Sequence, residues 1–154
     1  MLDANFILGP EAVGVSYAAD KTAVLCTLAE RFAHIYAVDR SAVLESLEER
    51  EALGSTGFGR GVAIPHARIE GISRPVSIVI RLERSIAFDS ADGMPVDLVF
   101  GLLSPAGSGA AHLHALAAIS RLIRDETIRD ALGNAADGEE LYAMLSNVWD
   151  RDAA

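Results

Sequence analysis

The four histidines of the chain have different settings, and His66 has the one best suited to chemistry. It follows Pro65 directly, in a segment with four glycines between positions 54 and 61. Glycines let a backbone adopt conformations that side chains forbid, so such a segment can hold a side chain in a fixed geometry. A neutral imidazole held there can attack a phosphoryl group through one nitrogen, while a hydrogen bond to the other nitrogen sets the tautomer. The alternative interpretation is a capped surface histidine.

His112 and His114 are two residues apart near the start of an expected helix, so they cannot share a face of it. His112 falls on an apolar stripe, whereas the stripe of His114 becomes polar, and we therefore expect only His112 to be a partly buried site residue. Its place in the first turn, where backbone N–H groups and the helix dipole favour anions, also suits phosphate. His34 ends another expected helix, where the dipole favours an imidazolium, and we assign it no role.

Three residues shortly before His66 are further candidates. Arg50 lies in the charged cluster 48–51, which would ordinarily be a solvated helix end. If that helix end folds onto His66, the guanidinium could hold phosphoryl oxygens with two hydrogen bonds. Ser55 and Thr56 could donate hydroxyl or backbone hydrogen bonds to the same phosphate, although they are equally good turn formers.

The segments that must position these residues alternate between helical and strand patterns. Apolar spacing and capping residues predict a helix at 20–34 and a second one from Asp39 or Ser41 to the stop at Gly54. Strands are expected at 62–64, 75–83 and 95–104, and further helices at 110–125, 125–135 and 137–148. The order predicts an α/β fold with a mixed β-sheet sandwiched between helices, and with His66 in a loop after the first of these strands.

The bulk properties bound the class of protein. With 154 residues, 51% of them hydrophobic and 23% charged, we expect one domain over 1–154 with a substantial core. The sequence has no apolar run of the roughly 18 to 20 residues that a membrane span needs and no signal-peptide pattern, which predicts a cytoplasmic protein. The net charge of −9 argues against binding to nucleic acid or to an anionic membrane and favours basic partners.

Metal and redox sites find little support in the sequence. Cys26 is the only cysteine, which precludes an intrachain disulfide, and its apolar setting predicts a small core residue. The spacing of His112 and His114 is poor for chelating a metal together with His66. We therefore expect neither a metal nor another cofactor.

Three stretches of sequence together carry a known signature. They are REALGSTGFGRGVAIPHARIEGI at 50–72, IAFDSADGMPVDLVFGLLSPAGSGAAHLHALAAISRLIRD at 86–125 and DGEELYAML at 137–145. Their combination resembles the type-2 EIIA domains of the bacterial phosphotransferase system (PTS), a family with fructose, mannitol and nitrogen branches. The likeness is greatest to the nitrogen-related EIIA proteins. It extends from about Asp20 to Leu145, which marks the expected core of the domain.

The resemblance implies a role for three of the candidate residues. His66 resembles the phosphorylated histidine of the family's IPH motif, His112 resembles the second histidine in HL-x-x-L, and Arg50 resembles the arginine before LGSTG that helps to hold the phosphoryl group. Family members accept that group from the phosphohistidine of the small carrier HPr or of its nitrogen-branch counterpart. The family fold, a mixed sheet sandwiched by helices, agrees with the order of elements above.

The resemblance therefore implies a phosphotransferase that carries phosphohistidine and acts as a nitrogen-branch regulator. One alternative is a sugar-branch EIIA that passes the phosphoryl group to an EIIB cysteine. Another is a binding regulator of target proteins, for which phosphorylation of His66 is only a switch. The sequence shows no EIIB or membrane EIIC segment, so we expect a free-standing regulator. Ala67 is a departure, because many members have glycine there, and it bears on the local backbone geometry.

Overall fold

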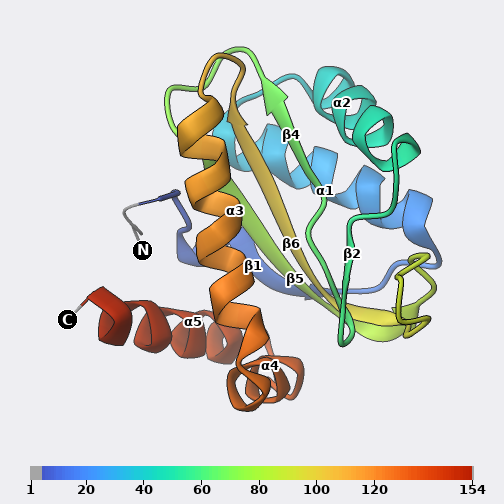
Figure 1. Cartoon of the computed structure of the whole chain (residues 1–154), viewed down its shortest axis with the longest axis vertical. Coiled ribbons are helices and arrows are strands. Elements are labelled where there is room, and N and C mark those ends of the chain that lie inside the picture. Colours follow the sequence, from blue (N-terminus) through green and yellow to red (C-terminus); the bar gives the residue numbers. More distant parts are fainter. Residues whose placement is uncertain (1–4, 154) are drawn as a thin grey trace.

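The computed structural model describes residues 5–153, and the side chains up to residue 149. A six-stranded mixed sheet has the order β1-β5-β6-β3-β2, with β4 also paired to β6 (Figure 1). The strands are β1 (Val13–Ser16), β2 (Gly57–Gly59), β3 (Val62–Ala63), β4 (His66–Ile69), β5 (Val76–Ile86) and β6 (Val96–Pro105). The helices are the 3-10 turn η1 (Pro10–Ala12), α1 (Lys21–Tyr36), α2 (Arg40–Ala52), α3 (Gly109–Arg124), α4 (Glu126–Gly133) and α5 (Gly138–Ala153).

Helices α1, α2 and α4 begin at capping residues that the sequence offers. The Asp20 carboxylate accepts a hydrogen bond from the Ala23 backbone N–H at the start of α1, and Asp39 does the same for α2. Asp125, between α3 and α4, accepts hydrogen bonds from the backbone N–H groups of Thr127 and Ile128 in the first turn of α4. Each cap satisfies a backbone donor that the helix itself leaves unpaired, which is why these boundaries could be predicted.

The long antiparallel pair of β5 and β6 forms the centre of the sheet. In β6 every residue from Leu98 to Ser104 is buried, as expected for a strand covered on both faces. Gly101 in β6 lets α1 approach closely, because a Cβ there would lie 2.9 Å from a methyl of Leu28 and 3.1 Å from the Phe32 ring. The packing of α1 on the sheet thus depends on this glycine.

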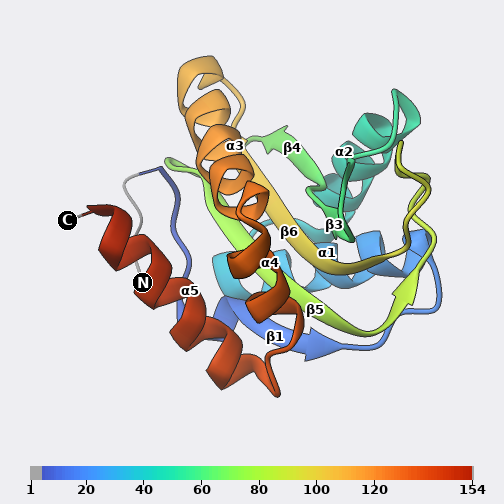
Figure 2. The same cartoon turned by 60° about the horizontal axis from the view of Figure 1, so that its bottom comes forward.

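Helices cover both faces of the sheet. In Figure 1, α3 crosses in front of β5 and β6, whereas α1 runs behind them, and α4 and α5 continue the front layer. The turned view in Figure 2 keeps α3 and α1 on opposite sides of the central strands. The predicted α/β class, a mixed sheet sandwiched between helices, is confirmed.

Three strands were missed or misplaced from sequence. β1 lies before Asp20 and pairs in parallel with β5, so the sheet begins earlier than the expected core. β2 forms within the glycine-rich segment and pairs with β3. The prediction that His66 lies in a loop was wrong, because His66 begins β4 and pairs with Leu102 of β6. Pro65 separates β3 from β4, because it has no N–H to donate to a neighbouring strand. Its carbonyl still accepts the Leu102 N–H of β6.

Cys26 on α1 was predicted to be a core residue, but its side chain is only half-buried. Helical periodicity places it beside the buried stripe of α1 rather than within it. Within residues 5–153, no helix is long and apolar enough to cross a bilayer.

Candidate functional site

The two ring nitrogens of His66 have different partners. Nδ1 lies 2.7 Å from the carbonyl oxygen of Ile64, and Nε2 lies 3.3 Å from Nε of Arg50. A carbonyl can only accept and the arginine Nε–H can only donate, so the proton of the neutral ring is on Nδ1. Nε2 therefore carries the lone pair and is the nucleophilic atom.

The surroundings of His66 favour this neutral form. Burial is the largest influence and lowers the pKa of His66 below its ordinary value of 6.5. The hydrogen bond to Ile64 and the charge of Glu51 act against this, and the charges of Arg50 and Arg68 add to it. At neutral pH the imidazole is consequently uncharged and able to attack an electrophile.

Arg50 reaches His66 because it lies in the last turn of α2. Its Nη1 donates to the carbonyl of Gly54 at 2.8 Å, while its Nε faces His66. Gly54 has a φ of 153°, a conformation that side chains rarely adopt, and there the chain turns back towards the sheet. The end of the helix is thus folded onto His66. Arg50 therefore contacts the site and is not simply part of a solvated helix end.

His112 comes to the same place from α3. Its ring centroid lies 5.4 Å from that of His66, with the planes tilted by 49°. Only 5% of His112 is exposed, and its Nδ1 lies 2.6 Å from the hydroxyl of the buried Ser104 on β6. Burial, with smaller contributions from His66 and Arg68, lowers the pKa of His112 to about 4. His112 is therefore a neutral hydrogen-bonding group at pH 7.

One part of the expectation for His112 is corrected by its backbone. Its N–H donates to the Ser108 carbonyl at 3.0 Å, because His112 is the fourth residue of α3 and already belongs to the helical ladder. Its amide is therefore not free for an anion. The expected difference from His114 is confirmed, since His114 is exposed on the other side of the helix.

The two histidines and Arg50 border one open cavity of about 570 Å³. Its walls come from α2, β4 and α3, and the lining residues are Ser46, Glu49, Arg50, Leu53, His66, Ala67, Arg68, His112, Leu113 and Leu116. Leu53 and Leu113 are 85% and 62% exposed, which is unusual for leucine and gives the cavity an apolar border. Two guanidinium groups, one carboxylate (Glu49) and two neutral imidazoles line the cavity, so its local charge is positive although the chain has a net charge of −9.

Arg68 is the functional candidate that the sequence analysis missed. Because side chains alternate along a strand, residues 66 and 68 of β4 point to the same face. The signal was present in the spacing of His66 and Arg68. It was overlooked because His66 was expected in a loop, where no such alternation holds.

Ala67, the departure noted in the sequence, fits its place without strain. It lies inside β4, is 8% exposed and is not among the described residues with positive φ. The backbone here needs no glycine.

Ser55 and Thr56 are close in sequence to the cavity but do not line it. The Ser55 hydroxyl donates to the Phe88 carbonyl at 2.5 Å. The Thr56 hydroxyl and backbone N–H both donate to the carboxylate of Glu51. In this structure both residues fix the turn after α2, and their hydroxyl groups are already engaged.

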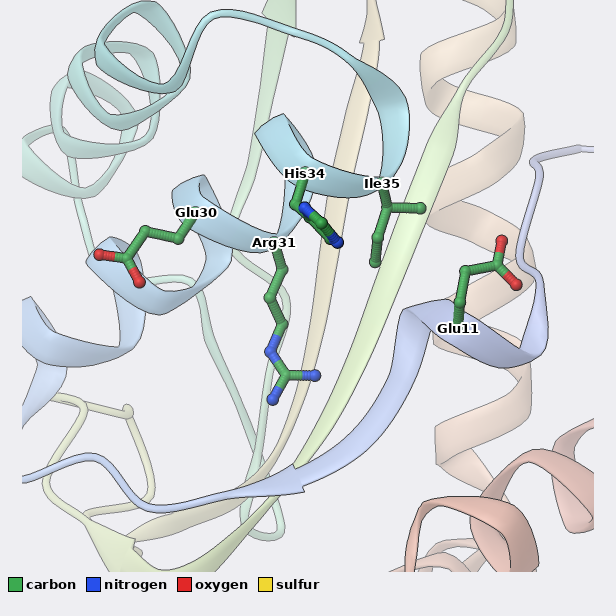
Figure 3. Close-up of a pocket in the computed structure, with 5 residues that line it drawn as sticks. All are labelled: Glu11, Glu30, Arg31, His34 and Ile35. Carbon is green, nitrogen blue, oxygen red and sulfur yellow. The ribbon is translucent and has the colours of Figure 1, made fainter.

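His34 lies in a different cavity, shown in Figure 3, which shares no residue with the first. It is lined by Glu30, Arg31, His34 and Ile35 of α1 and by Glu11 of η1, and in the figure Glu30 and Glu11 lie at opposite ends. Arg31 is held by the Ser16 hydroxyl at 2.5 Å rather than by His34. Among the residues described, no three histidine, cysteine or acidic side chains gather as metal ligands, and this includes the surroundings of His66 and His34.

Comparison with known proteins gives a consistent result. The family model described as "Phosphoenolpyruvate-dependent sugar phosphotransferase system, EIIA 2" matches residues 7–148. The nitrogen regulatory protein of Bradyrhizobium diazoefficiens is 42% identical over 141 residues, which are 91% of this chain and 92% of that protein. The PTS system fructose-specific EIIA component of Haloferax volcanii is 38% identical over 100 residues, 65% of each chain.

A solved structure agrees with these likenesses. The nitrogen regulatory protein IIA-Ntr from Neisseria meningitidis matches with a TM-score of 0.82 and 32% identity, over 90% of this chain and 96% of that one. The residues that the family model matches also include β1, which lies outside the stretch covered by the motif-based resemblance. The resemblance inferred from the motifs is confirmed.

Proposed function

The chain belongs to the type-2 EIIA family of the phosphotransferase system, and from this premise we propose that it accepts a phosphoryl group on Nε2 of His66 in the cytoplasm. The donor is the phosphohistidine of an HPr-type carrier protein, of the nitrogen branch in the first instance. The observation that carries this proposal is the fixed tautomer of His66. The Ile64 carbonyl accepts the Nδ1–H, with 2.7 Å between nitrogen and oxygen, and the lone pair of Nε2 faces Arg50 in the cavity.

The transfer is an in-line displacement between two docked proteins. The Nε2 lone pair forms a bond to phosphorus while the N–P bond of the donor breaks, and the bonding pair returns to the donor imidazole. His66 keeps its proton on Nδ1, so the phosphorylated ring becomes cationic, and the Ile64 carbonyl is placed to stabilise that charge. No metal ion is needed to balance the step.

Three groups around His66 suit the charge of the moving phosphoryl group. Arg50 and Arg68 offer cationic hydrogen-bond donors to its equatorial oxygens. If the Ser104 hydroxyl donates to Nδ1 of His112, the remaining ring proton is on Nε2, where it can donate to a phosphoryl oxygen. The lowered pKa of His112 keeps it in this neutral form.

The exposed leucines suit a protein partner. Leu53 and Leu113 border the cavity and present apolar surface around a charged centre. An apolar contact area around polar reacting groups is typical of protein interfaces and would exclude water from the transfer. Addition of about two negative charges beside this surface would also change its affinity for partners, so carrier and switch roles can coexist.

The nitrogen branch is favoured by the likeness to the Bradyrhizobium nitrogen regulatory protein, which covers almost the whole of both chains. The likeness to a fructose-specific EIIA component supports the sugar branch as the second candidate. The two candidates differ in what they do with the phosphoryl group. A sugar-branch protein would hand it to an EIIB cysteine, whereas a nitrogen-branch regulator would keep it and change its protein contacts.

The test uses purified protein and phosphorylated donors of the nitrogen and sugar branches in separate reactions. We expect faster labelling by the nitrogen-branch donor, loss of labelling in His66→Ala and near wild-type labelling in His114→Ala. His114 is the matched control, because it is an exposed histidine close to the site. Equal loss in both variants, or no labelling by either donor, would contradict the proposal.

A further inference from the structure

Glu51 is a buried carboxylate next to the site that the proposed transfer does not use. Its side chain is 6% exposed although it lies in the last turn of α2. An acidic side chain at a helix C-terminus is disfavoured by the helix dipole, and a buried one needs partners. Glu51 has two, Lys21 and Thr56.

The first partner ties α1 to α2. Lys21 Nζ lies 2.7 Å from the Glu51 carboxylate and also sits 4.8 Å from the centre of the Phe88 ring. Lys21 is the first residue of α1 and Phe88 lies beyond β5. The Glu51 carboxylate is thus held on one side by Lys21, whose ammonium group is itself positioned by the Phe88 ring.

The second partner leads to His66. Both carboxylate oxygens of Glu51 accept from the Thr56 backbone N–H, at 3.2 and 3.3 Å, and one also accepts from the Thr56 hydroxyl. The carbonyl of Thr56 accepts the Ile64 N–H at 2.9 Å. The carbonyl of Ile64 in turn accepts the Nδ1–H of His66 at 2.7 Å.

Glu51 is also joined to the other side of His66. It follows Arg50 in α2, and its backbone carbonyl accepts the Gly54 N–H at 3.1 Å. Gly54 is the residue whose carbonyl orients the Arg50 guanidinium at 2.8 Å. The backbone of Glu51 thus belongs to the turn that orients Arg50, while its carboxylate belongs to the hydrogen-bond chain that ends on Nδ1 of His66.

We propose that Glu51 is the positioning residue of this site, and that through Thr56 its carboxylate holds the Ile64 carbonyl on Nδ1 of His66. The role rests on the proposed function, since it concerns the same histidine. It also gives Thr56 a different use from the direct phosphate contact expected from sequence. The charge of Glu51 raises the pKa of His66, in opposition to the two arginines.

The experiment compares Glu51→Gln, Glu51→Ala and Thr56→Val with the wild type in the full chain. Glu51→Gln keeps the shape and one acceptor for Thr56 but loses the charge, and Thr56→Val keeps the backbone N–H but loses the hydroxyl. Glu48→Gln is the matched control, because it removes the same charge from an exposed position of the same helix.

Two readouts are taken on folded protein, with the far-UV circular dichroism spectrum and the melting temperature as checks. The first is the ¹⁵N chemical shifts and the pKa of His66 by NMR, which need no donor protein. The second is the rate of labelling by a phosphorylated HPr-type donor. We expect Glu51→Gln and Thr56→Val to slow labelling about threefold and Glu51→Ala about tenfold, since each loses one or more hydrogen bonds of the chain.

Loss of the Nδ1–H signature together with slower labelling would support the positioning role, as would a lower pKa of His66 in Glu51→Gln. Unchanged ring shifts and pKa in the folded variants would overturn it, even if labelling slows, because Glu51 would then act only on stability or docking. Failure of wild-type protein to become labelled would refute the proposed function instead. The NMR comparison would still decide the positioning role.

Discussion

Replacement of Arg50 tests whether the guanidinium stabilises the moving phosphoryl group. Its Nε is 3.3 Å from Nε2 of His66, so oxygens of a phosphoryl group bound to that nitrogen would come within reach of the fork. A hydrogen bond to a charged group contributes about 1.5–3 kcal/mol, and about 1.4 kcal/mol corresponds to a tenfold change in rate. Loss of one such bond predicts a fall of about 10- to 100-fold in the labelling rate of Arg50→Gln.

The same variant should also make His66 a stronger nucleophile, an effect that opposes the expected fall in labelling rate. Because the charge of Arg50 lowers the pKa of His66, Arg50→Gln should raise that pKa and make the imidazole more basic. A more basic nucleophile would by itself react faster, so slower labelling with a higher pKa isolates the lost stabilisation of the phosphoryl group. Arg50→Lys keeps the positive charge but lacks the planar guanidinium with its paired donors, so its labelling rate should lie between those of the wild type and Arg50→Gln.

The assay follows transfer from a phosphorylated HPr-type donor at several donor concentrations, with the pKa of His66 measured by NMR on the same samples. Arg84→Gln is the control, since it removes a positive charge from an exposed position of β5. Labelling of Arg50→Gln within twofold of the wild type would refute the reasoning. An unchanged pKa of His66 would refute the electrostatic part of it.

Three further predictions follow from the geometry. Because the pKa values of His66 and His112 both lie below the ordinary 6.5, the unfolded chain takes up protons first as the pH falls. The free energy of unfolding should thus decrease from about pH 6.5 towards pH 5, and denaturant titration should find a smaller decrease in His112→Gln; an equal slope in both proteins would contradict this. Ser104→Ala removes the partner of His112 Nδ1 and should slow labelling about two- to tenfold, and wild-type kinetics would exclude that hydrogen bond from the mechanism. Gly101→Ala forces a methyl against Leu28 and Phe32 and should lower the free energy of unfolding by about 1–3 kcal/mol, which an unchanged denaturation midpoint would disprove.

Much of the fold could be predicted because its signals are local. The caps at Asp20 and Asp39 and the long apolar run of β6 are determined by neighbouring residues. β1 could not be predicted in this way, because it is only four residues long and exists through its pairing with β5. The same is true of β2, whose glycines indicate a turn unless the pairing with β3 is known.

Site residues that belong to a sequence motif could be predicted, whereas those whose position depends on the tertiary fold could not. His66, His112 and Arg50 were named from sequence, and the structure places all three around one cavity. Arg68 was missed because its orientation follows from β4, which itself depends on pairing with β6. Thr56 was assigned to the phosphate because nothing in the sequence shows that the Glu51 side chain turns inward to meet it.

The central claim is that Nε2 of His66 carries the phosphoryl group. The most direct measurement is NMR of ¹⁵N-labelled protein after reaction with a phosphorylated HPr-type donor, with the ³¹P–¹⁵N coupling assigned to a single ring nitrogen. We predict coupling to Nε2 of His66, with Nδ1 still protonated and bound to the Ile64 carbonyl. Coupling to Nδ1 of His66, or to a nitrogen of His112, would contradict the account.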